Sequence, residues 1–236
     1  MSDVPISRRA KNKARDVRHN LGVKVLGTKY NEEEWMKKQE DPFYWESRNH
    51  PHRDLLVEKV LKYRPRSVLE IGCNTGPNLF RLSEAIPEAH FTGVDISQVA
   101  VENGRKRFKE IGMDNVELIQ GKADDLSLFK DQEFDLVFTD AVLIYIGKDK
   151  IDQVANEMMR LVNKAIILIE YFDSSSTAEG KLIFEKGYWK RDYVALFRKF
   201  QRVTRIETSK ITKDQWNDEY WSSIGAVVEV VLGNEQ

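Results

Sequence analysis

A glycine-containing turn follows the apolar run at residues 67–71, whose fourth residue is the acid Glu70, and it opens a predicted helix. Gly72 and Gly76 allow positive φ and let the backbone approach a ligand closely. Asn74 lies between them, where a third glycine is common, and asparagine also tolerates the left-handed conformation. Ligands of open parallel sheets bind beyond the carboxyl ends of the strands, so this turn predicts a binding site.

A second acid, Asp95, ends the apolar run at residues 91–94, just over twenty residues after Gly72. A carboxylate at that place can accept hydrogen bonds from both hydroxyls of a ribose. The glycines lack the G-x-G-x-x-G spacing of dinucleotide-binding turns, and the G-x-x-x-x-G-K-[ST] pattern of phosphate-binding loops is absent as well. The pattern therefore favours a ribose-containing ligand and disfavours NAD.

Strand and helix patterns alternate along the chain, and this alternation would position these residues. Continuous apolar runs are typical of strands that are covered on both faces. Their alternation with helices predicts a parallel sheet with right-handed crossovers and helices on both sides. The expected strands lie at 67–71, 91–94, 116–119, 134–138, 165–170, 202–208 and 226–232, and the expected helices at 31–38, 52–63, 78–85, 99–111, 151–161 and 192–200.

The segment from Val68 to Leu168 resembles the class I S-adenosylmethionine-dependent methyltransferases. Its glycine turn is similar to motif I, usually written E/D-x-G-x-G-x-G, and F-D-L-V-F-T-D-A-V-L-I-Y-I at 134–146 is similar to motif IV. The resemblance implies an α/β fold, a Rossmann-like seven-stranded mostly parallel sheet with helices on both faces and an antiparallel C-terminal strand. It also implies methyltransferase activity, with S-adenosylmethionine as the cofactor.

The resemblance places cofactor contacts around the strand ends. Where the family commonly has G-D-A, this chain has Lys122 in place of the acid. The Ala123 backbone N–H and Asp124 would therefore bind the edge of the adenine. Capping of the next turn is the alternative role for Asp124. Arg48 would pair with the cofactor carboxylate, and Arg53 is the alternative. The predicted cofactor-binding residues are Glu70, Gly72, Asn74, Gly76, Asp95, Ile96, Ala123, Asp124, Asp140, Ala141 and Arg48.

Four further stretches resemble the methyltransferases associated with pseudaminic acid biosynthesis. They are G-x-N-x-G-x-N-L at 72–79, I-L-I-E-Y-F at 167–172, W-K-R-D-Y at 189–193 and Y-W-E-S-R-N at 44–49. The D/N-P-P-Y motif of DNA amine methyltransferases is absent. So is the second cysteine of RNA cytosine-C5 enzymes, since Cys73 is the only cysteine. The acceptor itself stays open, because one fold hosts many acceptors.

Methyl transfer from a sulfonium is an in-line displacement, for which a protein supplies alignment, exclusion of water and in some cases a base. Three residues are predicted to be catalytic. Tyr145 and Glu170 lie near the ends of the fourth and fifth strands, and His52 comes from the N-terminal segment. Histidine titrates near neutrality and is a natural base, although a surface turn around Pro51 is the alternative for His52. No metal site is predicted.

The net charge of -1 hides an uneven distribution. Residues 1–30 hold eight basic and two acidic residues, a net of +6, which leaves -7 for the remainder. We therefore expect a flexible or loosely helical basic N-terminal arm (1–30), an N-terminal helical cover (31–64) and a cofactor-binding domain (65–236). Three roles stay open for this arm: a solvated tail, a lid over the site, or a segment that binds an acidic partner.

Near-neutral charge argues against a dedicated nucleic-acid binder. No apolar run reaches the ~18 residues of a membrane span, and Met1–Arg9 lacks the apolar core of a signal peptide. The lone cysteine suits a reducing compartment. We expect a cytoplasmic enzyme that methylates oxygen or nitrogen of a small metabolite, an anionic sugar or carboxylic acid among the candidates. Protein or peptide methylation and a non-catalytic cofactor-binding or RNA-associated module are the alternatives, and the oligomeric state is undetermined.

Overall fold

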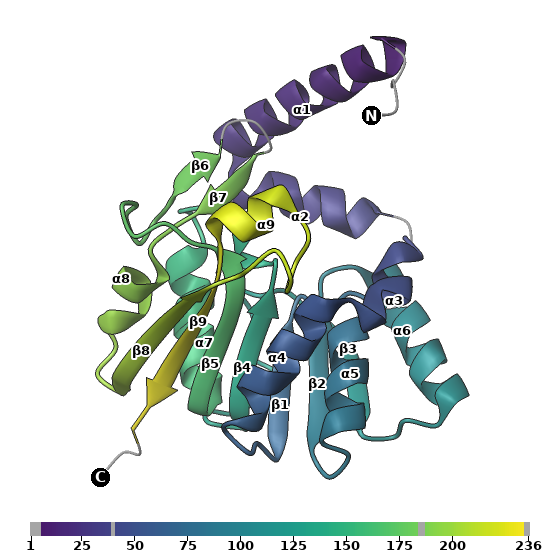
Figure 1. Ribbon diagram of the computed structural model, residues 1–236, viewed down its shortest axis with the longest axis vertical. Helices are drawn as coiled ribbons and strands as arrows, with labels where there is room; N and C mark the ends of the chain where they lie inside the picture. The colour runs from purple at the N-terminus through teal and green to yellow at the C-terminus, as the bar shows by residue number, and fades with distance from the viewer. Residues whose placement is uncertain (1–5, 39–40, 184–186, 234–236) are drawn as a thin grey trace.

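A seven-stranded sheet forms the centre of the computed structural model, which describes residues 6–38, 41–183 and 187–233 (Figure 1). The strand order is β3-β2-β1-β4-β5-β9-β8. The pairs from β3 to β5 are parallel, and β9 is antiparallel to both β5 and β8. The predicted fold class is confirmed. The strands are β1 (Ser67–Ile71), β2 (His90–Asp95), β3 (Val116–Gln120), β4 (Phe134–Asp140), β5 (Val162–Tyr171), β8 (Val203–Lys210) and β9 (Gly225–Leu232), with β6 (Lys181–Ile183) and β7 (Tyr188–Lys190) in a separate two-stranded sheet.

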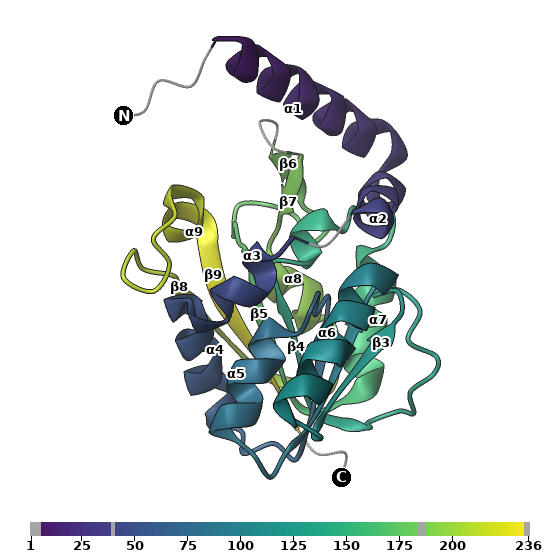
Figure 2. The ribbon, with the colours of Figure 1, turned by 90° about the vertical axis from the view of Figure 1, so that its right-hand side faces the viewer.

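Helices connect the parallel strands and cover both faces of the sheet (Figure 2). Leu56, Leu79 and Phe108, from three helices, belong to the core on one face, and Met158 and Leu196, from two others, belong to the core on the opposite face. The helices are α1 (Ile6–Leu26), α2 (Thr28–Lys37), α3 (Phe43–Glu46), α4 (Pro51–Leu61), α5 (Pro77–Ala85), α6 (Gln98–Ile111), α7 (Ile151–Leu161), α8 (Tyr193–Arg198) and α9 (Glu219–Ile224), with 3-10 turns η1 (Ser47–Asn49) and η2 (Leu143–Tyr145).

The apolar strand pattern has the structural meaning that the sequence suggests. Along β5, the segment from Ala165 to Tyr171 is buried without interruption, because helices cover the sheet on both faces. In α7, Ile151, Val154 and Met158 are buried at a helical spacing. The period of the apolar residues thus distinguishes the central strands from the helices that cover them.

The N-terminal segment is more ordered than expected. Residues 6–26 form the single helix α1, which projects from the body beside α2 (Figures 1 and 2). Asn20 and Val23 are buried at its C-terminal end, where the rings of His19 and Tyr30 meet at 5.3 Å. The first five residues of the predicted arm lie outside the described residues. Within the described part of the chain, no helix has the length and apolar character to cross a membrane.

One local prediction is corrected, and the structure adds short elements that the sequence did not predict. The helix expected at 31–38 begins at Thr28, so its three glutamates follow the first turn and do not cap it. The β6–β7 pair and α9 were not expected, since three-residue strands and a six-residue helix leave too short a pattern. The division into segments 1–30, 31–64 and 65–236 stays a prediction, and the first turn of α2 lies inside the first of them.

Candidate functional site

The turn between β1 and α5 adopts the backbone conformations that its residue types allow. Gly72 has φ of 78°, Asn74 of 50° and Gly76 of 81°. A Cβ built on Gly72 would lie 2.3 Å from a methyl carbon of Val142, so glycine is required there for space as well as for φ. A Cβ on Gly76 would meet the ring of Phe108 at 2.6 Å. Gly76 therefore serves helix packing, whereas Gly72 brings the turn close to the loop after β4.

Asn74 provides a test of the turn. We expect Asn74→Ala to melt roughly 2–4 °C below Asn74→Gly, because a left-handed residue with a Cβ costs ~1 kcal/mol. Both variants lose the Asn74 Oδ1 that accepts the Thr75 N–H at 2.8 Å, so the difference between them measures the strain alone. Calorimetric melting measures both variants. At the exposed helical position Asn156 the alanine variant should instead have the higher melting temperature, because alanine favours the helix more than glycine does. Equal melting of both variants at position 74 would contradict the strain argument.

The carboxylate of Asp95 lies beside this turn at the end of β2. Its Oδ2 accepts the Asn74 N–H at 2.8 Å, and its Oδ1 accepts the Ser97 N–H at 2.8 Å. Burial raises the pKa of Asp95, although the two backbone hydrogen bonds and the charge of Lys38 oppose that rise. Each oxygen keeps a further lone pair, so this fixed carboxylate can still accept hydrogen bonds from a ligand.

A pocket opens at the carboxyl ends of β1, β2 and β4, and it is closed above by α2 and α3. It contains about 880 Å³ of space, including the part open to solvent, within the range of small-molecule sites. Four carboxylates line it, and its described lining contains no lysine, arginine or histidine. The lining residues are Thr28, Asn31, Glu32, Trp35, Tyr44, Ile71, Gly72, Asn74, Val94, Asp95, Ile96, Gly121, Ala123, Asp124, Asp140, Ala141, Val142, Tyr145 and Ile146.

The structure brings most of the predicted residues together in this pocket. Predicted residues from four separate turns line it, namely Gly72, Asn74, Asp95, Ile96, Ala123, Asp124, Asp140, Ala141 and Tyr145. Burial raises the pKa of Tyr145 well above its ordinary value, and nearby tyrosines add to the rise. Tyr145 is therefore a neutral hydroxyl at physiological pH. Glu70, Gly76, His52, Glu170 and Arg48 are not among the lining residues.

Arg48 does not reach the pocket, contrary to the prediction. Its Nη1 donates to the Trp45 carbonyl at 3.1 Å, and its guanidinium lies over the rings of Trp45 and Phe80 at 5.3 and 5.7 Å. The alternative, Arg53, is buried and donates to the carbonyl and hydroxyl of Ser47 and to Asn78. Neither arginine lines the pocket, and Arg53 lies 3.7 Å from the carboxylate of Asp140 instead.

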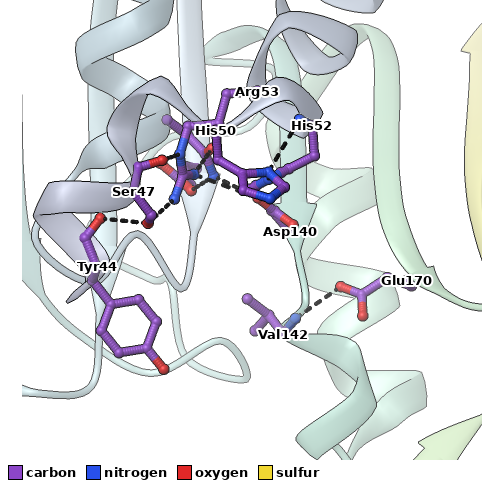
Figure 3. A network of polar contacts seen from close by, with 10 residues as sticks. Tyr44, Ser47, His50, His52, Arg53, Asp140, Val142 and Glu170 are labelled. Carbon is purple, nitrogen blue, oxygen red and sulfur yellow. Dashed lines mark hydrogen bonds and ion pairs between the residues drawn. The ribbon is translucent and has the colours of Figure 1, made fainter. Parts of the chain in front are cut away.

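Glu170 has no exposed surface, and backbone N–H groups donate hydrogen bonds to both oxygens of its carboxylate. Its Oε1 accepts the N–H of Val142 at 3.0 Å (Figure 3). The same oxygen accepts the N–H of Leu143 at 2.9 Å, and Oε2 accepts that of Ile144 at 3.2 Å. Burial raises the pKa of Glu170 to about 7, against the effect of these hydrogen bonds. The geometry makes Glu170 a poor candidate for the predicted catalytic role, because it faces the loop after β4 and not the pocket.

His52 reaches the pocket only through Asp140 (Figure 3). His50 Nδ1 accepts the backbone N–H of His52 at 3.3 Å and lies 2.6 Å from His52 Nδ1, so one of these two ring nitrogens carries the proton between them. His52 Nε2 lies 3.1 Å from Asp140 Oδ2, and that contact needs a proton as well. His52 thus holds the Asp140 carboxylate through its Nε2.

The carboxylate of Asp140 is held in place by several neighbours. Burial raises the pKa of Asp140, but the charges of His52 and Arg53 and the hydrogen bonds from His52 and Asn78 outweigh burial and leave the pKa below its usual value. Asn78 Nδ2 donates to Asp140 Oδ2 at 3.0 Å, and Arg53 Nη1 lies 3.7 Å from the same oxygen. Asp140 Oδ1 is buried without a partner. Asp140 is thus an ionised carboxylate that presents one unused oxygen.

Glu70 lies behind Asp140 and is joined to it by one residue. Asn78 Nδ2 donates to Glu70 Oε1 at 2.7 Å as well as to Asp140, and Glu70 Oε2 has no partner. Burial raises the pKa of Glu70 to about 8, although the Asn78 hydrogen bond and the charge of Arg53 oppose the rise. At neutral pH Glu70 is therefore largely a neutral acid.

Five pocket residues from α2 and α3 were not predicted: Thr28, Asn31, Glu32, Trp35 and Tyr44. The first four stand at positions i, i+3, i+4 and i+7 of α2, which is the spacing of one helix face. That spacing predicts a covered face but does not say what lies against it. The missing information is the contact between α2 and the loop after β4, which joins residues more than 110 positions apart.

Residues 68–165 match the model of a family described as methyltransferase domain. Among curated proteins, the demethylmenaquinone methyltransferase of Listeria welshimeri is 42% identical over 72 residues, which cover 30% of this chain and 30% of that protein. The matched segments span between about a fifth and less than half of the length of the curated relatives. The family match and the relatives' names support a transferase of methyl groups.

Solved structures share the fold. The PH0226 protein of Pyrococcus horikoshii superposes with a TM-score of 0.61 at 19% identity, over 82% of this chain and 96% of that one. An O-methyltransferase family protein of Burkholderia thailandensis gives 0.63 at 13% identity, over 89% of this chain and 60% of that one. At these identities the likeness extends to the fold alone.

Proposed function

We propose that this chain is an S-adenosylmethionine-dependent methyltransferase that acts on an oxygen or nitrogen of a small metabolite. The observation that carries the proposal is the pocket at the glycine turn, where backbone N–H groups of Asn74 and Ser97 hold the lining carboxylate of Asp95. A carboxylate fixed at the end of the second strand can accept hydrogen bonds from both ribose hydroxyls of S-adenosylmethionine. The methyltransferase domain match over residues 68–165 supports the same activity.

The residues present fit the parts of this cofactor. In the proposed arrangement Asp95 binds both ribose hydroxyls, Ile96 lies against the adenine, and Ala123 with Asp124 meets the adenine edge. The backbone of Gly72 and Asn74 approaches the methionine part, with Asp140 and Ala141 on its other side. Because Arg48 and Arg53 are engaged elsewhere, the cofactor carboxylate would be met by backbone N–H groups of the turn.

When bound, the cofactor supplies a methyl group that is already activated as part of a sulfonium. The protein has to align the acceptor, exclude water and take up a proton. Asp140 is an ionised carboxylate that lines the pocket, and we propose that it takes up that proton. His52, Arg53 and Asn78 hold Asp140 in position, and Glu170 holds the loop that carries Val142. We accordingly propose positioning roles for His52 and Glu170, and an orienting hydroxyl for Tyr145.

A thermal-shift series with S-adenosylmethionine, S-adenosylhomocysteine and NAD tests the proposal. A ligand at one hundred times its Kd stabilises the folded state by about 2.7 kcal/mol, which corresponds to a rise of roughly 5–10 °C in Tm for a chain of this size. Both adenosyl compounds should produce such a rise, and NAD should produce none. A response to NAD with no response to either adenosyl compound would overturn the proposed cofactor.

We further expect binding of S-adenosylmethionine to release a proton from Glu70 between about pH 5 and pH 8. The raised pKa of Glu70 means that the folded apoprotein holds a proton that the unfolded chain loses above pH 4.5, so this contribution to stability falls as the pH rises towards 8. A cation beside Asp140 favours the ionised form of Glu70, and cofactor affinity should therefore increase with pH.

Calorimetric titration at pH 7 in buffers of different ionisation enthalpy measures the proton release. Glu70→Gln should abolish it, and S-adenosylhomocysteine, which lacks the sulfonium charge, should release less. Binding heats that do not depend on the buffer would show that the cofactor charge does not act on Glu70.

A further inference from the structure

Helix α1 carries an apolar stripe, formed by Val17, Leu21 and Val25, on a side that faces away from the rest of the molecule. These side chains are spaced four residues apart and are 59%, 62% and 71% exposed. The helix is attached to the body through Asn20 and Val23, which are buried. Around the helix axis, Leu21 stands about 100° from Asn20 and about 160° from Val23. The stripe is therefore an exposed apolar surface of a kind that marks a binding site.

Basic side chains border the stripe on both sides. Lys13 and Lys24 are exposed along one edge of it, and Arg18 is exposed along the other. The sequence of α1 contains seven lysines and arginines and a single acid, Asp16. Asp16 stands about 140° from the middle of the stripe and pairs with Arg15 at 3.9 Å. An apolar stripe between rows of basic residues is typical of a helix that lies flat in the surface of an anionic bilayer.

The position of α1 separates its charges from those of the body. The helix projects from the body beside α2 (Figures 1 and 2). Its 21 residues span roughly 31 Å, and the buried Asn20 and Val23 lie near its C-terminal end. At physiological salt, exposed charges more than about 8 Å apart are largely screened from each other. The net charge of -7 on residues 31–236 is therefore screened from most of α1.

Other exposed apolar side chains lie on the elements that follow α1. Of the nine large apolar side chains that are exposed within the described residues, six belong to residues 17–43. Besides the stripe, they are Leu26 at the end of α1, Met36 in α2 and Phe43 in α3. Both α2 and α3 cover the pocket, which Trp35 and Tyr44 help to line. A surface bound through these side chains would lie on the side of the molecule that covers the pocket.

Charge and apolar area together distinguish between the possible occupants of the stripe. Two copies of α1 packed through their stripes would bring two helices of net charge +6 together, which is unfavourable. A nucleic acid would pair with the basic residues but would offer the aliphatic stripe no apolar environment. An anionic bilayer offers both negative headgroups at its surface and apolar chains beneath them. The lipid surface is therefore the occupant that fits both properties of the helix.

We propose that α1 binds the surface of an anionic phospholipid bilayer. The helix lies flat, Val17, Leu21 and Val25 insert below the headgroups, and Lys13 and Arg18 pair with those headgroups from the two edges of the stripe. This binding involves no methyl donor, so it goes beyond the proposed activity and is tested separately from it. Because headgroup pairing occurs at an exposed surface, the binding weakens as the salt concentration rises.

Co-sedimentation of the full chain with vesicles tests the proposal. Vesicles of phosphatidylcholine with about one third phosphatidylglycerol should bind the protein at least about tenfold more tightly than phosphatidylcholine alone at low salt. Raising the salt to about 0.5 M NaCl should remove most of this difference. A protein that shows no preference for the anionic vesicles, or whose preference does not respond to salt, would overturn the proposal.

Two substitutions separate the apolar and the electrostatic contributions. Leu21→Gln keeps the charge and Lys13→Gln keeps the stripe, and each should weaken binding to the anionic vesicles roughly fivefold. Their matched controls, Leu128→Gln and Lys109→Gln, alter exposed residues elsewhere and should bind as the original protein does. If Leu21→Gln bound the vesicles as tightly as its control, the stripe would not be the inserted surface.

A fluorescent label distinguishes insertion of the stripe from adsorption of the charges. Cys73 is buried, so a cysteine introduced by Leu21→Cys can be labelled selectively with an environment-sensitive dye. Its emission should shift to shorter wavelength when anionic vesicles are added. The same dye at Asp16→Cys, which lies on another side of the helix, should shift little. Equal shifts at the two positions would contradict the proposed orientation.

Two measurements without vesicles detect other occupants of α1. A dimer seen by analytical ultracentrifugation that Leu21→Gln dissociates would assign the stripe to a second copy of the chain. An RNA oligonucleotide that binds as tightly as the anionic vesicles, with no effect of Leu21→Gln, would assign the helix to nucleic acid. Either result would overturn the proposal, whereas a monomer with weak affinity for RNA is expected.

Discussion

Replacing Asp95 with alanine should weaken the binding of S-adenosylmethionine at least about 100-fold. A hydrogen bond to an ionised group contributes about 1.5–3 kcal/mol, and the two ribose hydroxyls together account for about 3 kcal/mol. Asp95 is preorganised for this task, because backbone N–H groups of Asn74 and Ser97 hold its two oxygens. Calorimetric titration of the purified protein measures the change in Kd.

The same substitution removes the acceptors of two backbone N–H groups, so the stability of the variant has to be measured alongside. Asp95→Asn keeps the size and one acceptor oxygen, and we expect an intermediate affinity from it. Asp114→Ala, at an exposed acid next to β3, is the matched control and should bind the cofactor as the original protein does. An unchanged Kd for a folded Asp95→Ala protein would show that Asp95 is not the ribose-binding acid.

Replacing Glu170 with alanine should lower the free energy of unfolding by at least about 3 kcal/mol, because three buried N–H groups lose their acceptor at once and each costs ~1–3 kcal/mol. These N–H groups belong to Val142, Leu143 and Ile144, in the loop that bounds the pocket. Urea unfolding monitored by tryptophan fluorescence measures the effect. Glu170→Gln should lose less, since it keeps one oxygen.

Two further measurements separate this positioning role from a catalytic one. In the original protein, the contribution of Glu170 to stability should fall as the pH rises from about 4.5 to about 7, since the folded form has the higher pKa, and Glu170→Gln should lack this component. Glu117→Gln, at an exposed acid of β3, should change stability little. Full stability of Glu170→Ala together with lost methyl transfer would restore the catalytic interpretation.

Some site residues could be recognised from the sequence because their environment is local. Asn74 was expected to tolerate a left-handed conformation, and its φ of 50° agrees. Asp95 and Asp140 end apolar strands, and parallel strands necessarily present their carboxyl ends at one edge of the sheet. For these residues a short stretch of sequence already contains the physical reason for their placement.

Other residues were misjudged because their partners lie far away in the chain. Glu170 also ends an apolar strand, yet its carboxylate turns towards the loop after β4, where three N–H groups need an acceptor. Arg48 is drawn to the rings of Trp45 and Phe80. A residue type and a strand end thus do not decide whether a side chain faces the ligand or supports the residues that do.

The sequence by itself determined the parallel sheet, the glycine turn and the acids at the strand ends, because apolar periodicity and backbone conformation act over a few residues. Only the tertiary structure decided that α2 closes the pocket with Asn31 and Trp35, and that Asp140 is held by His52, Arg53 and Asn78. These arrangements depend on contacts between distant segments, whose hydrogen bonds and charges are satisfied only when the whole chain has packed. The pairing of the pocket carboxylates with basic side chains, such as Glu32 and Asp124 with Lys150, is likewise a property that no single segment carries.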